Sequence, residues 1–286
     1  MNVFLTGGSG DLGSALARQL EARGDRPVVF DLRELRVACG TFVQGSVLDR
    51  AVLAAAMHGA ECVVHIAAWH GIHEKERTRA EFWDLNVTGT FNACDAALSA
   101  GAKRFVYISS TSATNPNSFY GHTKVLGEQV VAGFAHRSGT RAVSLRTSAF
   151  VPHISPFYKS FGEWVKRFAR GAVHVRDVVT SVLLAIDRTA DTSAPAHETF
   201  TIFGASEFTP DERANWTATT YAARYSKEDV QLARNCGIDP TERPRGPTAE
   251  ESRAAADVLG YRPTYSLQDA LNDLRKYGDG GPPAAE

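Results

Sequence analysis

The sequence has few cysteines, and none of them form a pair with metal-binding spacing. The four cysteines lie far apart with no C-x-x-C motif, at Cys39, Cys62, Cys94 and Cys236. Three of them fall in apolar segments, where a buried reduced thiol is favoured over a disulfide or a metal ligand. We therefore expect neither a disulfide framework nor a bound metal.

An excess of charge of one sign is also missing. The 286 residues include 31 basic and 32 acidic side chains, and there is no long run of either sign. With this balance, the sequence shows no basic cluster that would indicate binding to nucleic acid or to an anionic membrane surface. We expect the partner to be a small-molecule substrate.

Long apolar runs are absent as well. No stretch approaches the roughly 20 residues that a membrane span needs. The N-terminus lacks the basic start and longer apolar core of a secretory signal. With 43% hydrophobic and 22% charged residues, the composition is that of an ordinary globular protein. We expect it to be cytoplasmic.

Short apolar runs alternate with longer helical patterns through the first 190 residues. Nearly continuous apolar runs predict strands covered on both faces, and alternation with helices predicts a parallel sheet with right-handed crossovers. The expected strands are Asn2–Thr6, Pro27–Asp31, Thr41–Gln44, Cys62–Ile66, Arg104–Ser109, Ala142–Arg146 and Thr199–Phe203. The expected helices are Asp11–Arg23, Asp49–Met57, Thr78–Ala100 and Tyr120–Ser138. The predicted fold class is α/β, a Rossmann-type doubly wound parallel sheet.

After Gly204 the chain changes to helical segments joined by loops that contain proline and glycine. The expected helices lie near Asp211–Arg224, Lys227–Asn235, Thr248–Leu259 and Leu267–Tyr277. Thr248 and Glu251 have capping-box spacing, which supports a helix start there. We therefore expect a small, mainly helical C-terminal lobe.

Three glycines follow the first strand and open the first helix. Gly7 permits a tight turn, Gly10 lets the backbone approach a pyrophosphate, and Gly13 lets helix and strand pack closely. The helix N-terminus adds N–H groups and a partial positive charge. The pattern predicts a dinucleotide site; the alternative is a strand-to-helix turn whose glycines are only structural.

Asp31 ends the second expected strand, 18 residues after Gly13. A carboxylate there accepts hydrogen bonds from the ribose hydroxyls and repels a 2′-phosphate. The predicted cofactor is therefore NAD rather than NADP, although Arg33 can soften that discrimination. Residues 1–147 and 173–190 are expected to form the NAD-binding domain, and 148–172 and 205–286 the substrate lobe.

Tyr120 and Lys124 are four residues apart, on one face of an expected helix. A free tyrosine titrates near pH ~10, and a nearby cation favours the phenolate and lowers its pKa. Tyr120 can then exchange a proton with a substrate hydroxyl while hydride moves to or from nicotinamide. The alternative is an ordinary tyrosine and lysine on a surface helix.

Together these motifs resemble the extended short-chain dehydrogenase/reductases, the NAD-dependent epimerase/dehydratase family. The glycine spacing is G-x-x-G-x-x-G. The other matching segments are Val63–Ala68, Asn86-Val-Thr-Gly-Thr, Phe105–Thr111, Tyr120–Lys124, Leu145-Arg146, His174-Val-Arg-Asp177 and the stretch from Leu259 to Leu267. The resemblance covers nearly the whole chain.

The resemblance implies further site residues. Lys124 would bind the nicotinamide ribose, and Thr111, between Ser110 and Ser112, would hold the substrate oxygen as a third catalytic group. The remaining implied cofactor contacts are Asp11 and Leu12 at the pyrophosphate, Ser46 and Val47 at the adenine, Ala67 and Ala68 along the cofactor, Asn86 as a brace, and Thr147 at the nicotinamide. It also implies a homodimer that pairs the helices within 78–100 and 120–138.

Two short stretches depart from the family pattern. Thr111 and Tyr120 lie nine positions apart, and 27 residues lie between Arg146 and His174. Nucleotide-sugar members have more chain at both places, so the substrate is expected to be smaller, such as a sugar or a sugar acid. Compact members such as the uronate dehydrogenases are shortened in a similar way.

His70, His73 and Glu74 follow the fourth expected strand. This loop lies at the carboxyl ends of the strands, where substrates bind in such folds. Substrate contact by His70 and plain loop polarity both remain open, while the spacing does not match a helical zinc motif.

The leading hypothesis is an NAD-dependent dehydrogenase or reductase. An epimerase or dehydratase that keeps NAD bound is the alternative, although Ser112-Ala113-Thr114 stands where a dehydratase would carry a carboxylate pair. A non-catalytic NAD sensor is a third possibility, but such proteins commonly lose the Tyr–Lys pair.

Overall fold

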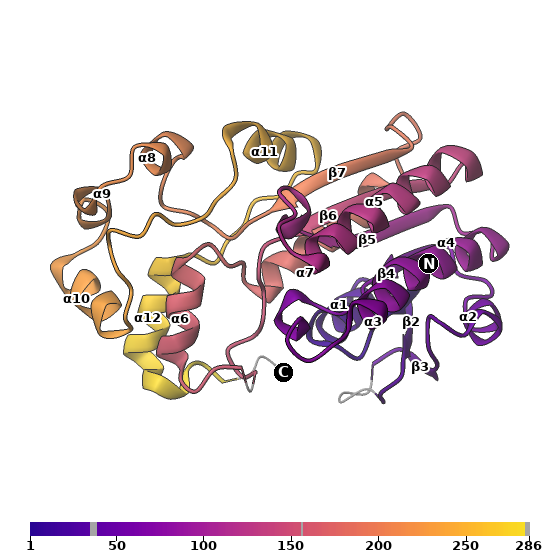
Figure 1. The fold of residues 1–286 in the computed structure, drawn as a ribbon, viewed down its shortest axis with the longest axis horizontal. Helices are drawn as coiled ribbons and strands as arrows, with labels where there is room; N and C mark the ends of the chain where they lie inside the picture. The colour runs from indigo at the N-terminus through magenta and orange to yellow at the C-terminus, as the bar shows by residue number, and fades with distance from the viewer. Residues whose placement is uncertain (35–38, 156, 284–286) are drawn as a thin grey trace. The chain divides into compact units, whose positions relative to one another are not determined.

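The computed structural model describes residues 1–34, 39–155 and 157–283 (Figure 1). These residues form two compact units. The first comprises Met1–Thr147 and Val179–Phe200, and the second comprises Ser148–Val178 and the chain from Thr201 onward.

A seven-stranded sheet in the order β3-β2-β1-β4-β5-β6-β7 organises the first unit. Its strands are β1 (Asn2–Thr6), β2 (Arg26–Asp31), β3 (Thr41–Gln44), β4 (Cys62–His65), β5 (Arg104–Ser110), β6 (Arg141–Thr147) and β7 (His197–Ile202). The pairs from β3 through β6 are parallel. The order of β1 to β6 is that of a doubly wound dinucleotide-binding sheet, which confirms the predicted fold class.

Helices cover this sheet. They are α1 (Asp11–Ala22), α2 (Arg50–Ala56), α3 (Arg79–Trp83), α4 (Gly89–Ser99), α5 (Phe119–Ser138) and α7 (Val175–Arg188), which begins in the second unit. Short helical turns lie at η1 (Gly71–His73) and η3 (Thr111–Ala113). Side chains from α2, α4 and α5, such as Leu53, Ala93 and Val131, pack with Phe4 and Phe105 of the sheet in one apolar core.

The segment expected as one helix over 78–100 is interrupted. A π-helical turn, η2 (Asp84–Thr88), separates α3 from α4. Such turns often occur at functional sites, and this one carries the buried Asn86.

The second unit is mainly helical, with α6 (Phe161–Ala169), α8 (Pro210–Ala214), α9 (Ala218–Ala222), α10 (Lys227–Asn235), α11 (Ala249–Arg253) continuing as η4 (Ala254–Val258), and α12 (Leu267–Tyr277) followed by η5 (Gly278–Gly280). The helix expected over 211–224 is two helices, because Thr217 caps a new start at α9. An aromatic cluster that includes Phe161, Trp164, Phe168 and Phe208 forms much of the core of this unit. Among the described residues, no helix is long and apolar enough to span a bilayer.

Candidate active site

Parallel pairing brings the predicted site residues of β1, β4, β5 and β6 to one edge of the sheet. Thr6 is in register with His65, His65 with Tyr107, and Ser110 with Thr147. The carboxyl ends of these strands therefore lie side by side, where ligands bind in open α/β sheets.

Two glycines of the turn after β1, Gly7 and Gly13, have no room for a side chain. Gly7 has φ +67°, and an added Cβ would lie 2.7 Å from the backbone nitrogen of Ala67. At Gly13 an added Cβ would lie 2.4 Å from Cα of Gly8, whereas at Gly10 its nearest neighbour would be the Gly7 carbonyl oxygen at 3.3 Å. Gly7 and Gly13 are thus required by packing, and the surface above Gly10 is bare backbone.

The first turn of α1 fits a phosphate group. Its N-cap is Gly10, which has no side chain to accept the first N–H groups. The N–H of Ser14 bonds to the Gly10 carbonyl, so the N–H groups of Asp11, Leu12 and Gly13 lie in the uncapped first turn. Backbone donors at a helix N-terminus suit an anionic pyrophosphate.

The Asp31 carboxylate lies at the end of β2, beside this turn. Its Oδ2 accepts the Ser9 N–H at 3.1 Å, and its Oδ1 accepts the Arg33 N–H at 3.1 Å. Each oxygen keeps a further lone pair, because a carboxylate has about four acceptor positions. The geometry suits a carboxylate that also accepts from a ribose.

Five further residues that the resemblance assigns to the cofactor lie at or after the ends of strands. Four of them follow a strand, and the fifth, Thr147, is the last residue of β6. Ser46 and Val47 follow β3, and the Ser46 hydroxyl accepts the Leu48 N–H. Ala67 and Ala68 follow β4 and are half-buried. The Thr147 hydroxyl donates to the Ser109 carbonyl at 3.3 Å.

Asn86 ties the loop after β4 to α5 (Phe119–Ser138). Its side-chain oxygen accepts the Trp69 N–H at 2.8 Å, and its side-chain nitrogen donates to the Trp69 carbonyl and to the Thr123 hydroxyl, both at 3.0 Å. All the polar atoms of this buried amide are therefore engaged, and Asn86 acts as a brace.

Tyr120 lies in the first turn of α5, which begins at the Ser118 cap. Burial raises the pKa of Tyr120 to about 12; the side chain of Ser110 opposes the rise and the charge of Glu74 adds to it. The expected lowering by Lys124 is not found. The reason is that desolvation of the phenolate dominates, while the Lys124 ammonium is directed to a carbonyl group.

Lys124 is 2% exposed, one turn further along α5. Its Nζ donates to the Ile108 carbonyl at 2.8 Å and lies 4.8 Å from the centre of the Tyr107 ring. Burial lowers the pKa of Lys124 to about 7, against the opposing charge of Glu128. The pair predicted from spacing is thus placed at the strand ends, with a lysine that is poised between its two protonation states at neutral pH.

Three hydroxyl side chains, Ser110 at the end of β5 and Thr111 and Ser112 after it, were singled out in the sequence. The Ser110 hydroxyl accepts the Ser112 N–H at 3.1 Å and caps η3. It is also the one of the three whose side chain acts on the Tyr120 phenol. Thr111 begins η3 and is half-buried, so its assignment as the third catalytic group stays a prediction.

The loop after β4 covers Tyr120. A Cβ added to Gly71 would lie 3.1 Å from the Tyr120 ring, and the Glu74 carboxylate accepts the Tyr120 N–H at 2.9 Å. Desolvation lowers the pKa of His70 to about 4, and Lys124 and His73 act in the same direction. The His70 residue itself is exposed on this loop. The described residues contain no cluster of three metal-ligating side chains.

Sequence reasoning missed a partly buried ion pair formed by Glu128, one turn after Lys124 on α5. Glu128 accepts two hydrogen bonds from Arg146, Nε to Oε1 at 2.9 Å and Nη2 to Oε2 at 2.7 Å, and a third from Ser109 at 2.5 Å. The sequence did contain a signal for Glu128, because Tyr120, Lys124 and Glu128 follow one another at four-residue spacing on one helix face.

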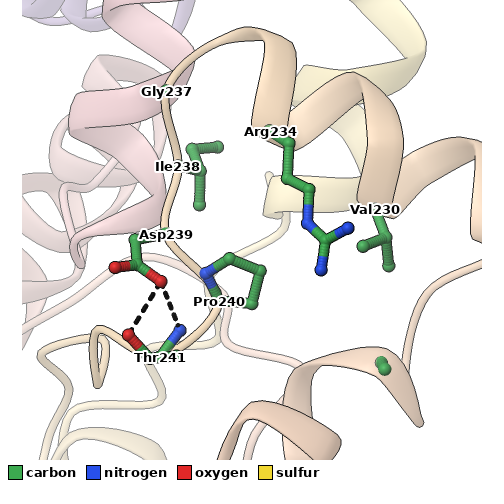
Figure 2. A pocket seen from close by; sticks show the side chains of 8 residues that line it. Val230, Arg234, Gly237, Ile238, Asp239, Pro240 and Thr241 are labelled. Atoms are coloured by element: carbon green, nitrogen blue, oxygen red, sulfur yellow. Dashed lines mark hydrogen bonds between the residues drawn. The ribbon is translucent and has the colours of Figure 1, made fainter.

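The second unit has a pocket of its own, of about 460 Å³, that contains none of the predicted site residues. Figure 2 shows Val230 and Arg234 on α10, with Ile238 and Pro240 on the loop that follows. In this loop Asp239 accepts hydrogen bonds from the N–H and hydroxyl of Thr241.

With this geometry established, comparison with known proteins identifies the family. The sequence profile of the NAD-dependent epimerase/dehydratase family matches residues 3–202. The chain belongs to this family. The resemblance inferred from the motifs is thereby confirmed.

Several curated relatives are named as enzymes of nucleotide sugars. The chain is 34% identical over 184 residues to UDP-glucose 4-epimerase of Rhizobium meliloti (strain 1021), covering 57% of this chain and 55% of that protein. It is 26% identical over 151 residues to an inverting UDP-N-acetylglucosamine 4,6-dehydratase of Campylobacter jejuni, covering 49% and 45%. The chain thus spans about half the length of the curated relatives it matches.

Solved structures with this fold are matched over nearly their full length. MoeE5 in complex with UDP-glucose and NAD has a TM-score of 0.70 at 22% identity, covering 95% of this chain and 96% of that chain. UDP-glucose 4-epimerase from Brucella ovis in complex with NAD has a TM-score of 0.69 at 21% identity, covering 98% and 99%. The likeness extends the fold assignment to the second unit.

Proposed function

We propose that this chain is an NAD-dependent oxidoreductase that transfers a hydride between NAD and a small hydroxyl or carbonyl compound, a sugar or a sugar acid. The observation that carries the proposal is the Tyr120–Lys124 pair, on α5 beside the carboxyl ends of the strands. The glycine turn, the bare first turn of α1 and the Asp31 carboxylate support NAD as the cofactor.

In this mechanism Tyr120 exchanges a proton with the substrate oxygen. Its raised pKa keeps the phenol protonated at neutral pH, so it is ready to donate during carbonyl reduction. Bound NAD supplies or accepts the hydride. Lys124 would hold the nicotinamide ribose, Ser110 or Thr111 would orient the substrate oxygen, and the loop at His70 would contribute to substrate contact.

An epimerase that keeps NAD bound is the second candidate. The similarity to the Rhizobium UDP-glucose 4-epimerase favours it. The two short stretches of chain, around 111–120 and 146–174, favour a smaller substrate instead.

Cofactor turnover separates the candidates. Sugars, sugar acids and UDP-sugars are incubated with the protein and NAD, and NADH absorbance is followed. Accumulating NADH with a sugar or sugar acid supports the dehydrogenase. Inversion of a UDP-sugar without net NADH establishes the epimerase and overturns the leading proposal.

We also propose a homodimer formed through the α3–α4 region and α5. The support is a row of exposed apolar side chains, with Trp83 on α3 at 47%, Phe91 on α4 at 51% and Leu98 on α4 at 53% exposure. Residues seven apart, such as Phe91 and Leu98, lie on one face of a helix. The cytoplasmic location and the absence of nucleic-acid partners stay predictions.

A further inference from the structure

We propose that Tyr107 is a positioning residue that holds the Lys124 ammonium group against the face of its ring. The inference rests on the proposed function, in which Lys124 binds the nicotinamide ribose. It adds a residue of β5 to the Tyr120–Lys124 pair, and it assigns the role to the Tyr107 ring rather than to the Tyr107 hydroxyl.

The Lys124 ammonium group is held by two consecutive residues of β5. Its Nζ lies over the Tyr107 ring, 4.8 Å from the ring centre, and donates a hydrogen bond to the Ile108 carbonyl at 2.8 Å. Among the described residues these are its polar contacts, and no carboxylate forms an ion pair with it. Tyr107 and Lys124 are 1% and 2% exposed, and the attraction between a cation and a ring face is strongest when both are desolvated.

The Tyr107 ring is itself fixed by its neighbours. Its hydroxyl end lies against α5 at Gly127, where an added Cβ would lie 2.2 Å from the hydroxyl oxygen and 2.7 Å from Cζ. His65, on the adjacent strand β4, stacks on the ring with the ring centres 5.9 Å apart and the planes 17° apart. The His65 imidazole is held in turn by the hydroxyls of Thr6 at 2.6 Å and Thr90 at 3.0 Å. The ring is therefore a fixed surface beside the lysine.

Hydrogen bonding by the Tyr107 hydroxyl does not account for a tyrosine at this position. This buried hydroxyl has no hydrogen-bond partner among the described residues. The nearby Thr90 hydroxyl donates to the Asn86 carbonyl at 2.7 Å instead. A buried hydroxyl without a partner lowers stability. The position therefore presents a ring face to Lys124, which a phenylalanine would also present.

A ring face suits a lysine that must bind a ligand. An ammonium group has three N–H donors, and the Ile108 carbonyl takes one of them. A carboxylate at the place of the Tyr107 ring would engage the remaining donors in a strong charged hydrogen bond. The ring attracts the whole charge through its quadrupole instead. Lys124 is thus fixed on α5 without an ion pair that would compete with the ribose hydroxyls.

The test is a double-mutant cycle on NAD binding by the full chain. Calorimetric titrations are run at about pH 6, below the pKa of about 7 to which burial lowers Lys124. We expect Tyr107→Leu to weaken NAD binding by about tenfold and Tyr107→Phe to restore it to within about twofold of wild type. In the Lys124→Met background, Tyr107→Leu should have little further effect. A coupling factor of about threefold or more supports the proposal, and a smaller factor overturns it.

Phe105→Leu is the matched control. Phe105 lies two residues earlier on β5, is fully buried, and packs edge-on against Phe134 with ring centres 5.7 Å apart. Its replacement removes a ring from the same strand without removing the ring that faces Lys124. NAD affinity should stay close to that of wild type. An equal loss of affinity in Phe105→Leu and Tyr107→Leu would contradict the proposal, because any missing core ring would then explain the effect.

A further variant replaces Tyr107→Leu if that protein does not fold. Pentafluorophenylalanine incorporated in place of Tyr107 has nearly the shape of phenylalanine, but its fluorines withdraw electron density from the ring face. The attraction for the ammonium group is then lost while the packing is kept. NAD binding should be about tenfold weaker than in Tyr107→Phe. Equal affinity in the two proteins overturns the proposal.

An NMR measurement without cofactor separates this proposal from the proposed function. Lysine is labelled with ¹³C at Cε, and the Lys124 signal is assigned by its loss in Lys124→Arg. The Tyr107 ring should shift the attached protons of Lys124 upfield of those of the exposed lysines, in wild type and in Tyr107→Phe. A Lys124 signal among those of the exposed lysines contradicts the proposal even if the chain binds NAD. Failure to bind NAD would count against the proposed function, and this signal would still test the contact between Lys124 and Tyr107.

Discussion

At the scale of single residues, Asp31 is the group that should set cofactor preference. Its carboxylate is fixed by the N–H groups of Ser9 and Arg33, so it cannot move aside for a 2′-phosphate. In Asp31→Ala we expect weaker NAD binding and a preference for NAD over NADP that falls by about tenfold, because charge repulsion near a surface is worth about 1–2 kcal/mol.

Calorimetric titration of both cofactors measures this change. Asp49→Ala is a suitable control, because Asp49 caps α2 and carries the same charge. Equal discrimination in Asp31→Ala and wild type would remove Asp31 from the cofactor site.

His65 should make the fold sensitive to acid. It bonds to the hydroxyls of Thr6 at 2.6 Å and Thr90 at 3.0 Å, and burial lowers its pKa to about 3 from 6.5. Because the folded pKa is depressed, its contribution to stability is complete above about pH 6.5 and is lost as the pH falls toward 3. The loss is on the order of a few kcal/mol.

Urea unfolding at a series of pH values tests this. His65→Gln should be less stable than wild type at pH 7, and its stability should fall less between pH 6.5 and 4. His58→Gln, at an exposed position, is the control. Parallel pH profiles for His65→Gln and wild type would show that His65 does not carry the acid dependence.

The sequence was most informative about residues whose role depends on local spacing. Gly7, Gly10, Gly13, Tyr120 and Lys124 could be found in this way, because a turn and one helix face bring them into position. The raised pKa of Tyr120 could not be found, because it arises from burial by other segments, including the loop at Gly71. Its sign was opposite to the expectation from Lys124 alone.

At the scale of elements, the packing of α5 requires a residue without a side chain at Gly127. A Cβ there would lie 2.2 Å from the Tyr107 hydroxyl, whereas at Gly133 on the same helix there is open space. Gly127→Ala should therefore destabilise the protein by about 1–3 kcal/mol through overpacking. Gly133→Ala should stabilise it by about 0.5–1 kcal/mol through helix propensity.

Thermal or urea unfolding of the two variants gives the comparison directly. Tyr107 also faces Lys124, so Gly127→Ala should reduce activity more than Gly133→Ala does. A destabilisation of equal size in both variants would contradict the packing argument.

The ends of helices and strands could be predicted where a single hydrophobic pattern extends over the whole element. The strands were found to within two residues at each end, because most of them are nearly continuous apolar runs that are buried in the sheet; β3 is the exception, since its residues are exposed or half-buried. The π-helical turn at 84–88 and the break at 215–217 were not found, since a helical pattern continues through both. Helix α6 was not among the expected helices, although Phe161, Trp164 and Phe168 have helical spacing.

At the scale of the whole molecule, the exposed apolar row on α3 and α4 should control association. Glutamate at Phe91 or Leu98 places a charge where a second copy would bury that row, so either change should shift the protein toward monomer. Ile154→Glu is the control, because Ile154 is 63% exposed in the second unit. Sedimentation velocity distinguishes the species, and a monomeric wild type would refute the dimer.

The central claim is proton transfer by Tyr120, and Tyr120→Phe tests it most directly. The measurement is NADH formation on the best substrate of the screen, with NAD binding measured in parallel and Tyr277→Phe as the control. We predict a loss of activity on the order of 10²–10⁴-fold, with NAD affinity close to that of wild type and little change in the control. Activity in Tyr120→Phe equal to that of wild type would contradict the account.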